Sequence, residues 1–208
     1  MSKKPYWEPC GPCEWDDDYD DFGLENDGVL TTAEAGLKAC FRMLWEQHVY
    51  WTRMTIISIV FNLPDLEATT NRLLRNAPDF AKIFRSFYGR RTAAEIERLF
   101  TDHLTIAAAL VTAAKAGDTR AAQAAERRWY QNADDIVDLL NEINPHWPVD
   151  EMRRMWREHL RLTKSEAVQM INRNYTKSIA IFDKVEIQAL MMADAFSNGI
   201  IQQFPEKF

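Results

Sequence analysis

The sequence predicts an all-α protein, an up-and-down bundle of about six helices built from repeated helical hairpins. From residue 31 onward, apolar residues recur three and four positions apart, which is the spacing of a helix face. Gly, Asn or Pro ends each apolar run, and no segment alternates apolar and polar residues for long enough to be a strand. With 208 residues, 47% of them hydrophobic, the chain can bury a sizeable core.

The first two helices have clear start and stop signals. Thr31 and Glu34 form a capping-box pattern that predicts the start of the first helix, which ends before Pro64. The second helix is expected to begin at Pro64 and to reach Gly89. We expect a bend near Pro78, because proline lacks a backbone donor and clashes with the preceding turn.

Four further helices are expected over residues 92–116, 118–143, 149–172 and 176–203. Gly117 is a typical residue after a helix C-terminus, and Asp118 or Thr119 can cap the next helix. The Asn-Pro-His-Trp-Pro segment at residues 144–148 predicts a rigid connection between the fourth and fifth helices.

An internal repeat organises the predicted bundle. Residues 72–104 align without a gap on residues 128–160, and eight of the 33 positions are identical. The segment around His48 resembles the end of both copies, so the chain divides into three helical hairpins. Because short connections make successive helices antiparallel, the first, third and fifth helices should run parallel.

Three of the four histidines occupy the same place in these repeats. His48, His103 and His159 each follow an aromatic residue by three positions, which places them near the apolar face of a helix. If the three helices run parallel, the imidazoles lie at similar heights and converge. Three imidazoles and one carboxylate would suit a divalent metal, zinc or iron.

The other members of this candidate metal site follow from helix spacing. Glu166 lies seven residues after His159, and Glu186 lies beside the apolar stripe of the last helix, so both are candidate carboxylate ligands. Thr52 and Thr163 follow their histidines by four residues, and their hydroxyls are candidates for holding the ligands in place.

The metal hypothesis has one alternative, and one missing motif restricts the kind of metal site. A repeat copies its core residues whatever their role, and a buried histidine bonded to a neighbouring helix is common in bundles. The Glu-x-x-His motif of di-iron proteins is absent, because Trp45, Phe100 and Trp156 stand three residues before the histidines. A mononuclear metal site or a purely ligand-binding site is therefore favoured over a di-iron centre.

The first 28 residues form a separate acidic and aromatic arm, and residues 29–208 form the bundle domain. The arm contains nine acidic residues and two lysines, a net charge of −7, which leaves about +1 for the rest of the chain. Cys10 and Cys13 resemble a thioredoxin tetrad but lack the preceding strand, so we expect a small disulfide, a pair of zinc ligands or an incidental role. The arm could mediate self-association or bind a protein partner.

Charge and hydropathy exclude several classes of function. A near-neutral bundle has no cluster of Lys and Arg to replace the counterions of nucleic acid. No run approaches the ~18 uncharged apolar residues of a membrane span, and the N-terminus lacks a secretory signal, so we expect a cytoplasmic protein. No nucleophile elbow, phosphate loop or acid pair indicates an enzyme class.

The segment from Trp45 to Arg53 and the two later histidine repeats resemble those of small uncharacterised bacterial all-helical proteins, which are loosely similar to ferritin-like bundles. The resemblance extends over residues 31–204 and implies a helical fold, with no established activity. Two functional hypotheses result. The first is a bundle that binds a metal ion or small ligand through core histidines, and the second is a scaffold without a cofactor that acts through its N-terminal arm.

Overall fold

The computed structural model describes residues 30–208. Within this range every regular element is helical, which confirms the predicted all-α bundle. The acidic arm and its Cys10 and Cys13 pair lie outside the described residues. The elements are α1 (Thr32–Phe61), α2 (Leu66–Leu74), α3 (Asn76–Lys115), α4 (Thr119–Ile143), α5 (Val149–Ile171), α6 (Tyr175–Gln203) and the short 3-10 helix η1 (Pro205–Lys207).

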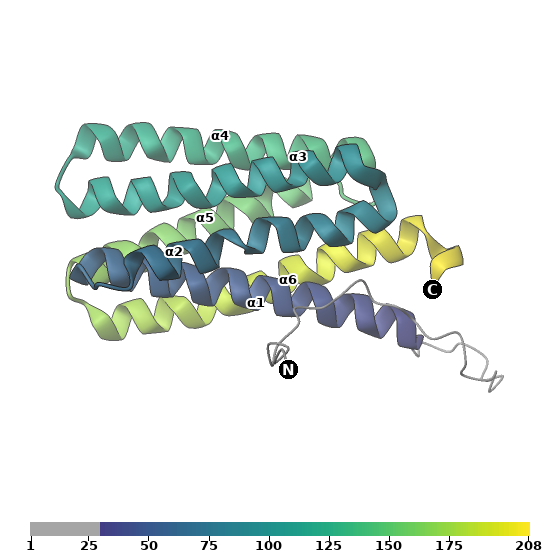
Figure 1. Cartoon of the computed structure of the whole chain (residues 1–208), viewed down its shortest axis with the longest axis horizontal. Helices are drawn as coiled ribbons and strands as arrows, with labels where there is room; N and C mark the ends of the chain where they lie inside the picture. The colour runs from purple at the N-terminus through teal and green to yellow at the C-terminus, as the bar shows by residue number, and fades with distance from the viewer. Residues whose placement is uncertain (1–29) are drawn as a thin grey trace, which may run out of the picture.

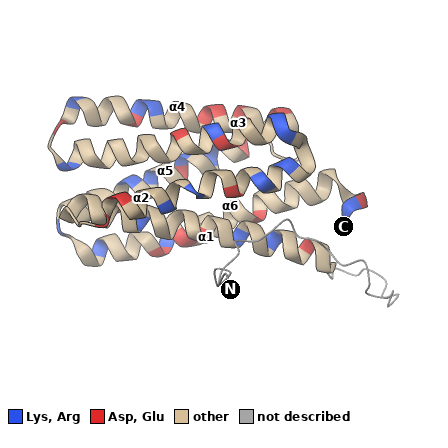
Figure 2. Ribbon diagram, in the orientation of Figure 1, with Lys and Arg blue, Asp and Glu red and all other residues tan. Residues whose placement is uncertain are grey.

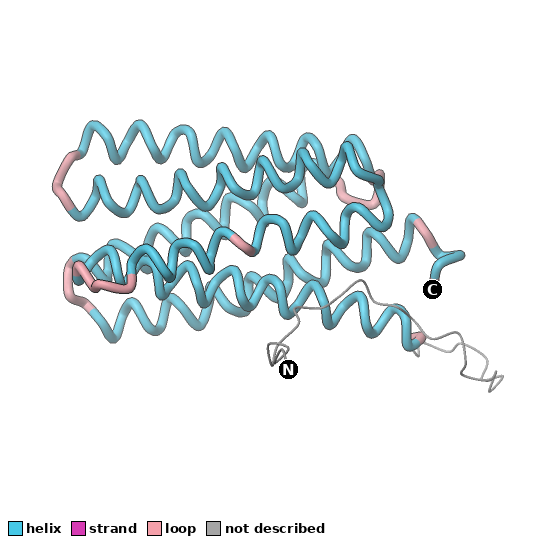
Figure 3. Tube along the Cα trace, in the orientation of Figure 1, coloured by secondary structure: helices cyan, strands magenta, loops and turns pink. Residues whose placement is uncertain are grey.

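The long helical segments alternate in direction, as the sequence predicts. Figure 1 shows α1 running toward the end of the bundle where α2 begins, and α2 with the first part of α3 running back. The second part of α3 is parallel to α1, α4 returns, α5 is again parallel to α1, and α6 closes the bundle beside α1. The connections between them are short (Figure 3), so neighbouring segments are antiparallel.

Two predicted helix boundaries shift in the structure. The helix expected from Pro64 to Gly89 is interrupted at Arg75, so Pro78 lies in the first turn of α3, where a missing backbone donor breaks no helical hydrogen bond. At Gly89 the backbone has φ 79° and ψ 179°, and α3 folds back on itself there (Figure 1). This positive φ favours glycine and produces the chain reversal between the second and third predicted helices.

The capping signals that were read from the sequence are present. The Thr31 hydroxyl accepts from the Glu34 backbone N–H at 3.1 Å, and the Glu34 carboxylate accepts from the Thr31 N–H at 2.8 Å, which completes the capping box of α1. The Asp118 carboxylate caps α4 by accepting from the Ala121 N–H. These caps fix where α1 and α4 start, and therefore the height of the residues they carry.

A large aromatic core holds the helices together. One continuous cluster of buried side chains spans the bundle, and its centre is aromatic. Phe41 contacts Phe80, Phe84 and Phe196 with ring centroids 5.8–6.4 Å apart, in tilted and edge-on arrangements that aromatic pairs prefer. Burial of each of these rings contributes about 1.5–3 kcal/mol to folding.

The connection between α4 and α5 is anchored to α6. The buried Asn144 side chain donates to the Gly199 carbonyl and to the Tyr88 hydroxyl, and accepts from the His146 N–H. The fully buried Trp147 donates from its indole nitrogen to the Ala195 carbonyl. Because its polar groups are bonded inside the protein, this connection is rigid, as the sequence indicates.

Figure 2 shows that residues of both charge signs are spread along the helices. Several are paired, including Arg42 with Asp194, which joins α1 to α6, and Arg157 with Asp134, which joins α5 to α4. Exposed pairs of this kind contribute little to stability. Among the helices of residues 30–208, none combines the length and the apolar character required to span a membrane.

The packing of Trp147 against α6 leads to a stability prediction for Gly199→Ala. A Cβ atom on Gly199 would lie 2.0 Å from the Trp147 Nε1, so the indole or α6 would have to move. We expect the free energy of unfolding to fall by about 1–3 kcal/mol, as is typical of overpacked cores. Urea denaturation would measure the change. Ile187→Ala, at an exposed position of the same helix, is the control and should alter stability much less.

Candidate metal centre

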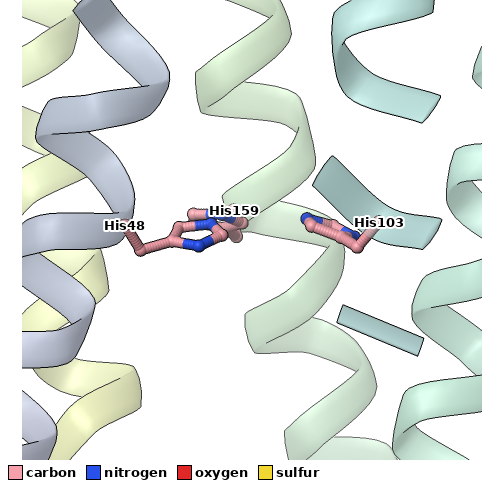
Figure 4. Close-up of side chains that lie close together, drawn as sticks. All are labelled: His48, His103 and His159. Atoms are coloured by element: carbon pink, nitrogen blue, oxygen red, sulfur yellow. The ribbon is translucent and has the colours of Figure 1, made fainter. Parts of the chain in front are cut away.

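Three histidines from three parallel helical segments meet in the core. Figure 4 shows the rings of His48, His103 and His159 at one level, extending from α1, α3 and α5 toward a common centre. All three are buried, with at most 3% of their surface exposed. One ring nitrogen from each lies within 4.8 Å of the corresponding nitrogens of the others, which confirms the predicted convergence.

Each imidazole is held by a side-chain amide from the next antiparallel segment. The Nδ1 atom of the histidine lies at hydrogen-bond distance from the amide oxygen, and the three contacts have nearly the same length. The pairs are His48 with Asn76 at 3.0 Å, His103 with Asn132 at 3.1 Å and His159 with Gln188 at 3.0 Å.

The same amides also contact the helix that carries the histidine. Each amide nitrogen donates to the backbone carbonyl of the residue four positions before its histidine. These bonds run from Asn76 to Leu44 at 2.9 Å, from Asn132 to Leu99 at 3.0 Å and from Gln188 to Met155 at 3.0 Å. One hydrogen-bonded unit of histidine, amide and carbonyl therefore occurs three times around the centre.

This unit fixes the tautomer of every ring. A backbone carbonyl only accepts hydrogen bonds, so the amide atom that contacts it must be the NH2 group, and the amide oxygen must face the imidazole. An amide oxygen also only accepts, so Nδ1 must carry the proton and donate. In a neutral ring the Nε2 atom is then unprotonated, and its lone pair is available to a metal ion.

Burial keeps the rings neutral. Desolvation lowers the pKa of His48 from 6.5 to about 4, against the raising effect of its bond with Asn76. For His159, burial and the neighbouring His48 lower the pKa to about 3, and for His103 burial and both other histidines also lower the pKa well below 6.5. Neutral imidazole is the form that binds metals, so the ligands are ready near neutral pH.

Aromatic rings close one side of the histidine layer. Trp45 and Trp156 contact each other at 5.8 Å and meet the histidine rings edge-on, with centroids 5.2 Å apart for Trp45 and His48. The Phe100 ring contacts Trp156 in a tilted arrangement, with centroids 5.8 Å apart. These are the aromatic residues three positions before each histidine, so the spacing that the sequence shows builds an apolar floor beneath the site.

The other side of the layer opens into cavities. A small cavity of about 10 Å³, roughly the space for one water molecule, is lined by the histidines together with Thr52, Ala107 and Thr163, which follow them by four residues. The hydroxyls of both threonines are buried and have no hydrogen-bond partner within residues 30–208. The predicted hydroxyls thus lie beside the histidines, but they do not bond to the ligand rings.

Glu166 lines the same cavity and is paired with Arg53. Its carboxylate is 1% exposed and accepts from the Arg53 guanidinium, which also contacts the Ser178 hydroxyl. Burial raises the pKa of Glu166 to about 7, although the charge and hydrogen bond of Arg53 oppose this effect. The carboxylate is close to the site, but the ligand cluster found in residues 30–208 consists of the histidines.

The second predicted carboxylate lies elsewhere. Glu186 accepts a hydrogen bond from the Tyr50 hydroxyl at 2.8 Å in an exposed contact, and it is not part of the lining around the three histidines. The helical spacing placed it near the apolar stripe of α6, but its side chain points past that stripe to the α1 side. Within residues 30–208, the group that could hold a metal ion therefore consists of the three imidazoles, and Glu166 lies beside it.

Sequence reasoning missed the three amides. Asn76 and Asn132 are among the identical pairs of the 56-residue repeat, so the signal was present, but an asparagine in a helix usually indicates a cap or a turn. Gln188 replaces asparagine in the last unit, and it is 29 residues after its histidine, as Asn132 is after His103. The spacing from histidine to amide is 28 residues in the first unit and 29 in the other two, and this near-constant interval is the signal that the sequence carries.

Comparison of the chain with protein-family models, curated proteins and solved structures found no match. The structure shows an all-helical bundle, and no relative supports the resemblance to ferritin-like or bacterial proteins. The function has to be argued from the site.

The buried neutral histidines predict that the metal-free protein loses stability below pH 6.5. The unfolded chain protonates all three histidines near 6.5, whereas the folded protein does not until much lower pH. Glu166 acts in the opposite direction, since its raised pKa lets the folded state bind one proton before the unfolded state does. Between pH 6 and 5 the unfolded chain therefore binds about two more protons than the folded protein. The free energy of unfolding should fall by about 2–3 kcal/mol per pH unit over this range.

Urea denaturation of metal-free protein at several pH values between 7 and 5 would measure this slope. The exposed His146 provides the control, because His146→Ala should leave the slope unchanged. A free energy of unfolding that stays constant over this range would contradict the neutral, buried state of the triad.

Proposed function

We propose that the protein binds one divalent metal ion, zinc in the first place, through the Nε2 atoms of His48, His103 and His159. The observation that carries the proposal is the threefold hydrogen-bonded unit, which leaves a lone pair on each ring directed away from its amide partner. A structural role for one buried histidine needs no such arrangement, whereas three rings with the same tautomer at one level match a metal site.

The spacing of the rings suits a metal ion. In a tetrahedral zinc site with Zn–N bonds of about 2.0–2.1 Å, the ligand nitrogens are about 3.4 Å apart. Nitrogens within 4.8 Å of one another reach this separation when each moves by less than about 1 Å toward the centre. Rotation about the side-chain bonds of three histidines is sufficient for this closure.

The donor set favours zinc over iron. Three neutral imidazoles and one open position are typical of catalytic or ligand-binding zinc sites, while non-haem iron centres commonly include a carboxylate ligand. Glu166 is already engaged by Arg53, so the fourth position is left for a water molecule or a small ligand. The cavity of about 10 Å³ beside the rings has room for one such molecule.

We further propose that residues 29–208 act as one metal-binding domain derived from a repeated hairpin. The gapless alignment of residues 72–104 on residues 128–160 and the equal spacing of histidine and amide in two of the units support this proposal. Each hairpin supplies one histidine from its first helix and one amide from its second. One hairpin alone could not form the site, because a metal needs all three rings.

Metal analysis of protein expressed without a histidine tag tests the proposal. We expect close to one equivalent of zinc per chain after dialysis, and none in the His103→Ala, His159→Ala double variant. His146→Ala, which removes the exposed histidine, should keep the full equivalent. Replacement by Co²⁺ should give the intense visible absorption of a tetrahedral site in the wild type and in His146→Ala.

If the wild-type protein bound no metal, and the double variant still unfolded in one cooperative transition, the metal function would be rejected. That result would favour the alternative hypothesis, a scaffold whose N-terminal arm binds a protein partner. Thermal unfolding with and without Zn²⁺ gives a second readout, because a ligand that binds the folded state raises its stability by about 2.7 kcal/mol at a hundred times its Kd.

The amide partners predict a separate effect on affinity. Asn132→Leu removes the acceptor of the His103 Nδ1–H and frees the ring to rotate. We expect zinc affinity to fall about 10- to 100-fold, as is typical when a bond that orients a ligand is lost. The free energy of unfolding should also fall by about 1–3 kcal/mol, because a buried donor is left unpaired.

Competition with a fluorescent zinc chelator would measure the affinity of this variant. Gln131→Leu is the matched control, since Gln131 is the exposed neighbour of Asn132 on α4 and bonds only to Asp135 within residues 30–208. If Asn132→Leu lowered stability while the zinc affinity stayed at the wild-type value, Asn132 would support the fold without orienting a metal ligand.

A further inference from the structure

A large apolar pocket adjoins the histidine layer. Its volume is about 370 Å³, within the range of small-molecule sites, and it shares Thr52, Leu104, Ala107, Trp129 and Thr163 with the small cavity around the histidines. A molecule in the pocket would therefore reach the open side of the proposed metal site, because the opposite side is closed by the aromatic floor.

The outer wall of the pocket is aliphatic. It is formed by residues about two to three turns beyond the histidines on α1, α3 and α5. These residues are Ile56, Ile59, Leu110, Val111, Ala167 and Ile171. Lys164 and Glu126 also line the pocket, but they are paired with each other, so their charges are compensated. Such a wall suits a hydrocarbon chain.

The inner end of the pocket carries unpartnered polar groups. Thr52 and Thr163 present buried hydroxyls, and Trp129, which is 2% exposed, has an indole N–H without a hydrogen-bond partner in the described residues 30–208. An indole N–H only donates, so it needs an acceptor. Buried donors without a partner are unfavourable in a folded protein. Trp45 and Trp156 in the aromatic floor also have unpartnered indole N–H groups within residues 30–208, whereas Trp129 adjoins a pocket with room for an acceptor.

The charges around the inner end favour an anionic acceptor. The three imidazoles are neutral, and Glu166 is paired with Arg53, so a divalent metal at the histidines would keep its full charge. A head group with one negative charge and oxygen atoms would complete the coordination of the metal and accept from the unpartnered donors. A carboxylate has this chemistry.

We propose that the pocket binds a medium-chain monocarboxylate, whose head group occupies the open metal position and whose alkyl chain lies between α1, α3, α4 and α5. The proposal rests on the metal site proposed above and names its ligand. The wall from Thr163 to Ile171 covers nine residues of α5, and the eight steps between them rise by about 12 Å. This length accommodates an extended chain of the octanoate class rather than a long-chain fatty acid.

A chain-length series tests the assignment. Butanoate, hexanoate and octanoate would be titrated by calorimetry into zinc-loaded full-length protein and into metal-free protein. Each added methylene buried in the pocket should tighten binding by about fourfold, until the chain fills the pocket. Octanoate should bind the zinc-loaded protein at least about tenfold more tightly than the metal-free protein, because the head group then contacts the metal.

Two alanines on α3 provide a matched pair of variants. Ala108 lines the pocket, and Ala109 is its exposed neighbour. Ala108→Phe should fill the pocket and weaken octanoate binding at least about tenfold, whereas Ala109→Phe should bind like the wild type. Both variants should keep one equivalent of zinc, since neither position lies in the histidine layer.

The outcomes separate the two proposals. Stoichiometric zinc without octanoate binding would overturn the ligand assignment and leave the metal site intact. Equal octanoate affinity with and without zinc, or equal affinity in the Ala108→Phe and Ala109→Phe variants, would also overturn it. A protein that holds no zinc would remove the basis of both proposals.

Discussion

The arrangement of the core depends on the burial of three imidazoles in an apolar bundle. A buried polar ring is unfavourable unless its nitrogens find partners, and each histidine satisfies Nδ1 with an amide that is itself bonded to a backbone carbonyl. These units link α1 to α3, α3 to α4 and α5 to α6, so they also fix the relative heights of the helices. The proposed metal ion would bind the other ring nitrogen, Nε2, of all three histidines together.

The layers along the bundle follow from helix periodicity. Positions three before each histidine carry Trp45, Phe100 and Trp156, which close one side. Positions four after carry Thr52, Ala107 and Thr163, which are small and leave room on the other side. The histidine layer is therefore closed toward the aromatic core and open toward the apolar pocket, so an ion at the proposed site would have its open position next to a hydrophobic wall.

Glu166 shows how burial and pairing compete at the edge of this site. Desolvation raises its pKa to about 7, while Arg53 stabilises the charged form. A nearby divalent ion would act in the same direction as Arg53 and favour the carboxylate. Glu166 would therefore respond to a metal ion bound at the proposed site, while Arg53 remains its ion-pair partner.

The sequence by itself determined the all-α class, the helix cap at Thr31, the alternation of helix direction and the meeting of His48, His103 and His159, because these follow from local spacing and short connections. It left the cap of the fourth helix open between Asp118 and Thr119, and the structure shows Asp118. It did not determine which polar groups from distant segments meet the rings. Asn76, Asn132 and Gln188 are 28 or 29 residues from their histidines, and Glu186 turned to Tyr50 instead of the site. Those contacts depend on rotation of each helix about its axis, which only packing in three dimensions sets.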